Sequence, residues 1–494
     1  MLLAGDHDEI ATLFEQFNRT LPVVAARTKA YFGFSGFWWP EYTHPLYGTT
    51  HPASYGCNRA GGGGGAAAGP IWHSEDRWNG YNRQGSLDLS LMILDHYAHT
   101  GQSGYLGIPV GVVEFYWNLW RNTSTAPGKP MVFFPTQAVE TWQCPGWPAV
   151  PTNCPTDDMP TVAGLHAVLE KLLANPPPAT TAATIASWTD MQRRLPPLPS
   201  RHVNGQTAYI PCADCVRAPA ATKNVNCTLW NCSCQEMTDM YGSDAGIGFG
   251  CAPKDAQYWW SSIKNCNTKK ASPCSDPPAA GCGTGLEKTH VGCCPACRAP
   301  PSPPSPPPAP PANPGKGCHH TSNSENAELY SVHPYRMATA ARGDAAALSA
   351  AQQAFQNRAF KGDRGWNQNA MDAALLGNAT NAAAFVLARA NTQPAAGYRF
   401  PSFAPHEQDY EPSSDHFGVY QNALGYMLMG LADDKAQSVV LLPAWPCSWD
   451  VEFRIHAPKQ TVITGAVVSG HLTFSVSPAS RKADVKAVPC QHIG

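Results

Sequence analysis

Charged side chains are scarce in this sequence: Asp, Glu, Lys and Arg make up 14% of its 494 residues, against about a quarter in typical soluble proteins. Lys plus Arg number 34 and Asp plus Glu number 36, so the sequence has no basic excess of the kind that holds nucleic acid. It also has no run of about eighteen apolar residues, which a membrane-spanning helix requires. We therefore expect a protein that binds no nucleic acid and does not span a membrane.

Common catalytic and cofactor-binding motifs are also missing. The sequence contains no G-x-x-x-x-G-K-[ST] phosphate loop, no H-E-x-x-H zinc motif and no G-x-S-x-G nucleophile turn. These absences give no reason to expect a cofactor or a catalytic metal. What the sequence does contain is a 43% hydrophobic fraction with 15 Trp, 17 Tyr and 17 Phe, which is typical of a folded protein with many aromatic surfaces.

Cysteines are concentrated in one segment, where thirteen of the 18 lie between Cys212 and Cys318. Such a density is typical of secreted disulfide scaffolds. Five N-glycosylation triplets fit the same compartment; they begin at Asn18, Asn122, Asn226, Asn231 and Asn378. The start of the chain, Met1 to Thr12, carries acidic residues where a signal peptide needs an apolar stretch. We therefore expect an extracellular or secretory protein whose native N-terminus is missing from this sequence.

Two cysteine pairs, Cys212/Cys215 and Cys294/Cys297, have the two-residue gap of zinc ligands. Because the pairs are far apart and lie among many other cysteines, disulfides are the favoured interpretation, with zinc as the alternative. His319 and His320 form either a metal-binding pair or a solvated loop.

The composition divides the chain into five segments. We expect a first helical part, a Cys-rich disulfide insertion, a Pro-rich spacer in which ten of the sixteen residues from Ala299 to Pro314 are proline, a second helical part and a small C-terminal β domain. Their bounds are residues 1–208, 209–298, 299–324, 325–435 and 436–494.

Within these segments, periodic apolar residues locate particular elements. Helices are predicted after Ser86, with Gly101 as the stop; around Val162 to Leu172, before a proline run; after Asp344; and from Phe417 to Leu431. Val451, Phe453 and Ile455 alternate as in a strand, and Ser469-Gly470 separates two apolar runs as in a hairpin.

Acidic residues inside aromatic loops are the strongest chemical signal. Glu41 follows Phe37-Trp38-Trp39-Pro40, Glu140 precedes Thr141-Trp142, and Asp415 precedes His416-Phe417-Gly418. A carboxyl group against aromatic rings loses hydration, which raises its pKa and lets it act as a general acid. One raised and one ordinary carboxyl group make a glycosidase pair. The alternative is that Glu140 and Asp415 cap helices or pair with arginines.

The order of several motifs resembles glycoside hydrolase family 95 over about 350 residues that exclude the Cys-rich insertion. The blocks that carry this resemblance are Phe37 to Glu41, Gly85 to Gly101, Gln137 to Trp142, Glu325 to Arg336, Gly365 to Asn369, Asp415 to Gly418 and Leu441 to Pro446.

The resemblance implies a mainly α fold, an (α/α)6-barrel-type helical domain followed by a β domain. It implies an inverting hydrolase that removes terminal α-L-fucosyl or related α-linked sugars from cell-wall or extracellular glycans. Glu140 falls on the family's general acid and Asp415 on its base. The expected partners are a glycan substrate and cell-wall polymers. The candidate sugar contacts are Trp38, Trp39, Glu41, Trp142, His333, Arg336, Trp366 and Gln368.

Two alternatives stay open. The family positions its attacking water with paired asparagines ahead of an aromatic block, and Gly36 to Glu41 has no such pair. This departure favours a non-catalytic glycan-binding or cell-wall protein on a decayed hydrolase scaffold. A polysaccharide lyase is the other alternative, with Tyr335 or His333 as base and Arg336 neutralising a uronate.

Overall fold

The computed structural model describes residues 2–39, 81–123, 129–143, 154–203, 205–215, 289–291, 294–296, 319–320, 325–362, 365–391 and 414–493. Most of the Cys-rich insertion, the Pro-rich spacer and Glu41 lie outside these ranges. So does a large part of each aromatic loop. The side chains of the first four residues of the helix that carries Asp415 are also outside the description.

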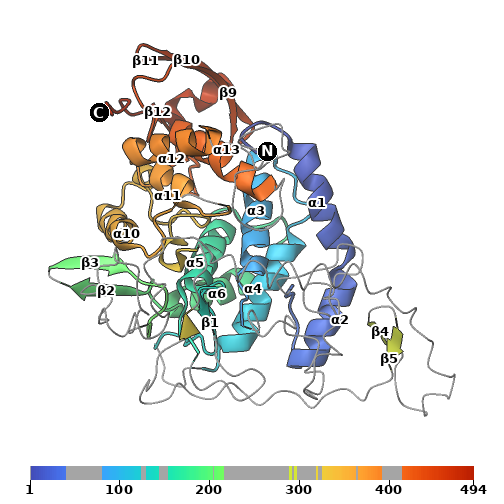
Figure 1. The fold of residues 1–494 in the computed structure, drawn as a ribbon. Coiled ribbons are helices and arrows are strands. Elements are labelled where there is room, and N and C mark those ends of the chain that lie inside the picture. The colour runs from blue at the N-terminus through green and yellow to red at the C-terminus, as the bar shows by residue number, and fades with distance from the viewer. Residues whose placement is uncertain are drawn as a thin grey trace, which may run out of the picture.

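Helices form about half of the described structure (Figure 1). The first helical part contains α1 (His7–Arg19), α2 (Leu21–Phe32), α3 (Gly85–Thr100), α4 (Gly107–Trp120), α5 (Met159–Ala174) and α6 (Ala182–Arg194). The second contains η3 (Ala327–Leu329), η4 (Ala340–Arg342), α10 (Ala345–Asn357), α11 (Asn369–Leu375), α12 (Ala379–Asn391) and α13 (Ser414–Leu428). The described structure is therefore mixed, about half helical with small sheets, and the described residues show no closed barrel.

The helix boundaries follow local sequence signals. Gly101 adopts a left-handed conformation with φ of 76° directly after α3, which is the position where glycine ends a helix at least cost. Asp344 accepts hydrogen bonds from the backbone N–H groups of Ala346 and Ala347 and thereby caps α10. The predicted helices at these sites are confirmed. The helix predicted from Phe417 to Leu431 is wrong at its end, because the chain leaves α13 at Leu428 and enters a strand.

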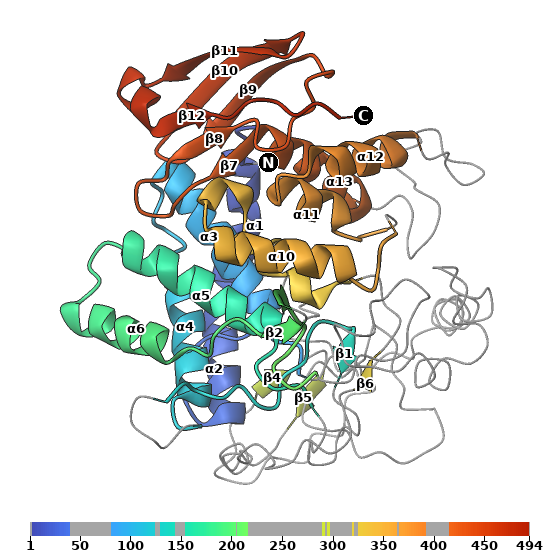
Figure 2. The same ribbon diagram turned by 90° about the vertical axis from the view of Figure 1, so that its left-hand side faces the viewer.

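The C-terminal sheets lie over one end of the helices (Figure 2). The strands β9 (Val451–Ala457), β10 (Thr461–Val468) and β11 (His471–Ser477) form an antiparallel sheet in the order β11-β10-β9. The predicted hairpin is confirmed: Val468 pairs with His471 across Ser469 and Gly470, whose φ values of 51° and 80° suit a two-residue hairpin turn. Beside it, a mixed sheet is formed by β7 (Met429–Leu431), β8 (Val439–Leu441) and β12 (Val485–Ala487). The short helix η6 (Ala479–Asp484) directly precedes β12 in the chain.

Six further short strands form three two-stranded sheets. These are β1 (Trp142–Gln143) with β6 (His319–His320), β2 (Ser200–Val203) with β3 (Gln206–Tyr209), and β4 (Thr289–Val291) with β5 (Cys294–Ala296). The β1–β6 pair has a functional consequence, because it brings the loop of Glu140 next to the start of the second helical part.

One hydrophobic core joins both helical parts and the β domain. Tyr116, Trp120, Tyr335 and Phe14 are among its largest fully buried side chains. The turn after β9 donates backbone hydrogen bonds from Lys459 to Ala98 and from Gln460 to His99, so the β domain is docked on the C-terminal end of α3. No helix in the described ranges is both long and apolar enough to cross a membrane.

Candidate active site

The loop that carries Glu140 is a tight reversal of the chain. Ala138 and Trp142 exchange two backbone hydrogen bonds of 3.1 Å, so the three residues between them form the tip. The side-chain amide of Gln137 donates to the carbonyl of Val139 at 2.9 Å. Val139 itself has φ of 49°, a left-handed conformation that is unfavourable for a β-branched residue by about 1–3 kcal/mol. The loop is therefore held in a strained conformation that fixes the position of the Glu140 backbone.

Glu325 is the carboxyl group that this loop meets. The backbone N–H of Glu140 donates to Glu325 Oε2 at 3.3 Å, and Thr141 Oγ1 donates to the Glu325 carbonyl at 3.2 Å. Glu325 lies 185 residues after Glu140 in the chain. The sequence interpretation included Glu325 in a matching block but gave it no role. Two carboxylic acids therefore meet where only one had been assigned a function.

The pKa of Glu325 is raised to about 8. Burial is the largest cause, and the neighbouring charges of Glu140 and Asp88 act in the same direction, while the hydrogen bond from the Glu140 backbone opposes the shift. A glutamic acid in this position carries a proton at neutral pH. A proton held near neutral pH beside a second carboxyl group is what a general acid requires.

Asp88, from the first turn of α3, extends this acidic group. The Tyr335 hydroxyl donates a hydrogen bond to Asp88 Oδ1 at 2.6 Å. Burial raises the pKa of Asp88 to about 7, although the hydrogen bond from Tyr335 opposes the shift. Tyr330 also lies within range of the charges of Glu325 and Asp88, and its hydroxyl forms a hydrogen bond with Gln368. We call Glu140, Glu325, Asp88, Tyr330, Tyr335 and Gln368 the acidic cluster.

Buried amides hold two members of the acidic cluster in place. Asn326, next to Glu325, donates to the Phe360 carbonyl at 3.0 Å and accepts the Phe360 N–H at 3.0 Å. Asn369, next to Gln368, is fully buried and donates to the carbonyls of Phe360 and Gly362 at 2.9 and 2.6 Å. These asparagines are structural supports, so Glu325 and Gln368 are fixed by their immediate neighbours.

Two predicted contact residues, His333 and Arg336, lie away from the acidic cluster. Arg336 pairs with Asp95, which is two helical turns, or about 10 Å, along α3 from Asp88. Lys171 also contacts Asp95, at 3.2 Å. Burial alone would raise the pKa of Asp95, but Arg336 and Lys171 lower it to about 2. Burial lowers the pKa of His333 to about 3, so its imidazole is neutral at pH 7.

The predicted aromatic wall is mostly core. Trp38 and Trp39 are 2% and 4% exposed. Trp38 stacks on Phe115 with ring centroids 5.9 Å apart, and Trp39 donates its indole N–H to Thr20 at 3.3 Å. Trp142, in β1, is 4% exposed. Of the four predicted tryptophans only Trp366 is partly exposed, and it precedes Asn367 and Gln368 in the chain.

The remaining predicted residues are described in part or not at all. Asp415 lies in the first turn of α13, and its side chain falls outside the description, as does Glu41. The structure thus brings Glu140 and Gln368 into one cluster and adds Glu325, Asp88 and Tyr330. Glu325, Asp88 and Tyr330 lie in sequence blocks that carry the family resemblance, but their residue types did not show which acidic side chains would be buried together.

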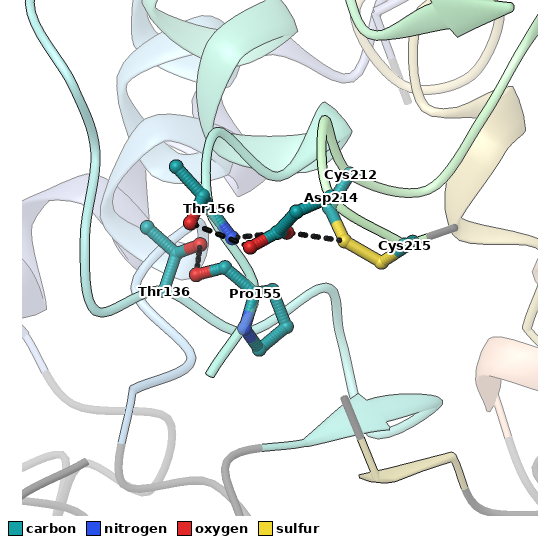
Figure 3. Close-up of a disulfide and its surroundings, with 6 residues drawn as sticks. All are labelled: Thr136, Pro155, Thr156, Cys212, Asp214 and Cys215. Atoms are coloured by element: carbon teal, nitrogen blue, oxygen red, sulfur yellow. Dashed lines mark hydrogen bonds between the residues drawn. A yellow bond between two sulfur atoms is a disulfide. The ribbon is translucent and has the colours of Figure 1, made fainter. Parts of the chain in front are cut away.

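Cys212, Asp214 and Cys215 form the one group of three or more His, Cys, Asp or Glu side chains that converges closely enough for a metal within the described ranges (Figure 3). The two thiols are joined as a disulfide. Asp214 accepts hydrogen bonds from the N–H and Oγ1 of Thr156 at 2.8 and 2.7 Å. A second disulfide joins Cys447 to Cys490. The disulfide interpretation of Cys212 and Cys215 is therefore confirmed, while Cys297 lies outside the described residues.

Comparison of the whole chain with protein-family models and with curated proteins gave no match.

Proposed function

We propose that the protein is an inverting glycoside hydrolase in which the Glu140–Glu325 pair supplies the proton to the departing oxygen and Asp415 activates the attacking water. The observation that carries the proposal is the partly buried Glu325 carboxyl group, whose pKa is raised to about 8 and whose Oε2 lies 3.3 Å from the backbone nitrogen of Glu140. Cleaving a glycosidic bond needs one protonated and one ionised carboxyl group on opposite sides of the sugar.

The role of Glu325 deepens the assignment made from sequence. Glu140 lies at the tip of a strained loop and is only partly buried, and Glu325, which keeps its proton at neutral pH, accepts a hydrogen bond from the Glu140 backbone N–H. In the proposed step the Glu140 carboxyl group gives its proton to the leaving oxygen while Asp415 takes a proton from the attacking water. Glu140, now a carboxylate, regains a proton from the acidic cluster, whose members Glu325 and Asp88 both have raised pKa values, and the cluster and Asp415 then exchange protons with solvent so that none is consumed. Gln368, which is only partly buried, is the member of the acidic cluster that we propose contacts sugar hydroxyls.

The scaffold and substrate in this proposal follow the resemblance to glycoside hydrolase family 95. We propose that the helices on both sides of the Cys-rich insertion belong to an (α/α)6-type barrel, and that the substrate is a terminal α-L-fucosyl-like sugar on a cell-wall or extracellular glycan. The Cys447–Cys490 and Cys212–Cys215 disulfides support an extracellular or secretory location, because disulfides persist mainly in oxidising compartments.

The contacts of Tyr335 and Arg336 count against a polysaccharide lyase. A lyase needs an ionisable base next to a free arginine. Burial and the charge of Asp88 raise the pKa of Tyr335 well above its ordinary value, so its hydroxyl keeps its proton. Arg336 is already neutralised by Asp95.

Hydrolysis of two kinds of α-L-fucoside tests the proposal: an aryl fucoside with a dinitrophenolate leaving group, and a fucosylated oligosaccharide. Glu140→Gln and Glu325→Gln should each lower turnover of the oligosaccharide by about 10²–10⁴-fold, because its leaving oxygen needs a proton. Both variants should retain much more of their activity on the aryl substrate, which leaves without protonation. Asp415→Asn should lose activity on both.

The matched control is Glu452→Gln, which removes an exposed carboxylate from β9 and should leave turnover unchanged. The first sugar released should have the anomeric configuration opposite to that of the substrate, as proton NMR can record. A wild-type protein that binds fucosylated glycans but cleaves no α-linked glycoside in a panel would overturn the hydrolase in favour of a non-catalytic glycan-binding protein.

A further inference from the structure

Four histidines from three separate parts of the chain meet beneath the β domain. His7 begins α1, two others lie one turn apart near the C-terminal end of α3, and the fourth is in β9. We call His7, His96, His99 and His456 the histidine cluster. The ring centroid of His7 lies 5.4 Å from that of His456, 6.2 Å from that of His99 and 6.3 Å from that of His96. His7 is therefore the centre of the cluster.

Two of these imidazoles are buried with ring nitrogens that lack hydrogen-bond partners. His96 is 1% exposed and His99 is 5% exposed. Among the described residues, His99 Nε2 has no hydrogen-bond partner, and neither ring nitrogen of His96 makes a hydrogen bond of acceptable geometry. Leaving a buried polar atom unsatisfied costs about 1–3 kcal/mol. An unexplained cost of this kind, repeated on neighbouring rings, indicates an absent ligand.

The hydrogen bonds that do exist leave the opposite nitrogens available. His99 Nδ1 is 2.7 Å from the carbonyl of Asp95, and His7 Nε2 is 3.3 Å from the carbonyl of Leu2. A carbonyl can only accept, so these nitrogens carry the protons and His99 Nε2 and His7 Nδ1 carry lone pairs. Metal-binding histidines have this arrangement, in which one nitrogen donates to a carbonyl and the other binds the ion.

The distances from the His7 ring to the other three rings are close to those within a coordination sphere. Two imidazoles bound to one Zn²⁺ at about 2.0–2.1 Å have ring centroids about 5 Å apart. The distance from the His7 centroid to that of His456 differs from this value by about 0.5 Å, and the distances from His7 to His96 and His99 differ from it by less than about 1.5 Å. No three ring nitrogens of the cluster converge in the present rotamers, so binding requires rotation of His7 and His456, which are only partly buried.

We propose that the histidine cluster is a binding site for one transition-metal ion of the Zn²⁺ type. Imidazole suits Zn²⁺, Cu²⁺ and Ni²⁺, whereas Ca²⁺ and Mg²⁺ prefer oxygen ligands. The site is separate from the acidic cluster: His99 lies eleven residues, or about 16 Å, along α3 from Asp88.

A metal at this point joins three elements that otherwise meet through few hydrogen bonds. The backbone N–H of His456 donates to the carbonyl of Leu3 at 2.9 Å, which places the N-terminal segment against β9. Gly5 allows this contact, because a Cβ at its position would lie 2.6 Å from His456 Nε2. The ion would hold the N-terminal segment, α3 and the β domain together. Its role is structural, since binding to the folded state alone stabilises that state.

The test is titration of the chelator-treated full chain with Co²⁺, followed by displacement with Zn²⁺. We expect one Co²⁺ per chain with the intense visible band of four-coordinate cobalt and no near-ultraviolet thiolate charge-transfer band, and a rise in the midpoint of thermal unfolding that follows metal occupancy. His7→Asn and His456→Asn change the less buried ligands and should each weaken Co²⁺ binding by at least about tenfold. His471→Asn, an exposed histidine on β11, is the matched control and should leave binding unchanged.

Absence of a four-coordinate Co²⁺ spectrum would overturn the proposal. A thiolate charge-transfer band would do the same, because it would assign the metal to cysteines. Equal affinity in wild type, His7→Asn and His456→Asn would also overturn it. Circular dichroism of each variant before metal addition separates lost binding from lost folding, and a misfolded His7→Asn leaves His456→Asn to decide.

Discussion

Replacing Glu325 with Gln should make the protein more stable at neutral pH while lowering hydrolysis of oligosaccharides by about 10²–10⁴-fold. An ordinary glutamic acid has a pKa of 4.5, and burial raises that of Glu325 to about 8. At pH 7 the unfolded chain is ionised at this residue and the folded chain is protonated. Folding at pH 7 must therefore protonate this group about 2.5 pH units above its ordinary pKa of 4.5, which costs about 3 kcal/mol at about 1.4 kcal/mol per unit. Gln has nearly the same shape as the protonated acid and removes that cost.

The sign of the effect depends on pH in a defined way. Between pH 4.5 and about 8 the folded state binds one more proton than the unfolded state, so the contribution of Glu325 to stability falls as pH rises. Below pH 4.5 both states are protonated and the cost disappears. The gain from Glu325→Gln should therefore be small at pH 4.5, about 3 kcal/mol at pH 7 and largest above pH 8.

Urea unfolding at pH 4.5, 6, 7 and 8 measures this dependence for wild type, Glu325→Gln and the exposed control Glu452→Gln. The control should follow wild type at every pH. A Glu325→Gln protein that is equally or less stable than wild type at pH 7, or whose gain does not grow with pH, would refute the conclusion that Glu325 is buried with its proton. Turnover measured on the same preparations shows whether the lost activity accompanies a folded protein.

Three further substitutions test the surroundings of the site. Asp95→Asn should lower the free energy of unfolding by about 3–5 kcal/mol at pH 7, because it removes the carboxylate that pairs with Arg336. Urea unfolding measures this difference from wild type, which should shrink as pH falls from about 4 toward the Asp95 pKa of about 2. Gly164→Ala in α5 would place a Cβ 2.7 Å from Tyr335 Cζ, so it should lower the thermal midpoint and turnover together, whereas Gly107→Ala, which meets nothing within 4 Å, should do neither. Trp38→Ala should cost about 3–5 kcal/mol of stability as a core truncation, and a loss of glycan affinity without a loss of stability would instead support the sugar wall.

Helix α3 connects the two proposed sites. Asp88 at its start belongs to the acidic cluster, and Asp95 in its middle pairs with Arg336 and Lys171. His99 at its end donates to the Asp95 carbonyl and belongs to the histidine cluster. Both ends of one rigid helix are therefore fixed by buried polar groups, and a shift of the helix would disturb both sites.

The sequence by itself determined the elements whose signals are local. Gly101 ends α3 because glycine adopts the left-handed conformation at low cost, and Asp344 begins α10 because its carboxylate accepts two free backbone N–H groups. Ser469-Gly470 sets the β10–β11 hairpin for the same kind of reason. The Glu140 loop also stood out from its own residues, as an acidic group among aromatics.

Only the tertiary structure decided which groups are buried together. The pKa of Glu325 depends on Glu140, 185 residues away, and on the hydration lost at their contact, and neither quantity is a property of the sequence around Glu325. Trp38 and Trp39 have the residue types of a sugar-binding wall, yet packing against Phe115 and Thr20 places them in the core. Desolvation and charge–charge interaction act through space, so the acidic and histidine clusters exist only once the chain has folded.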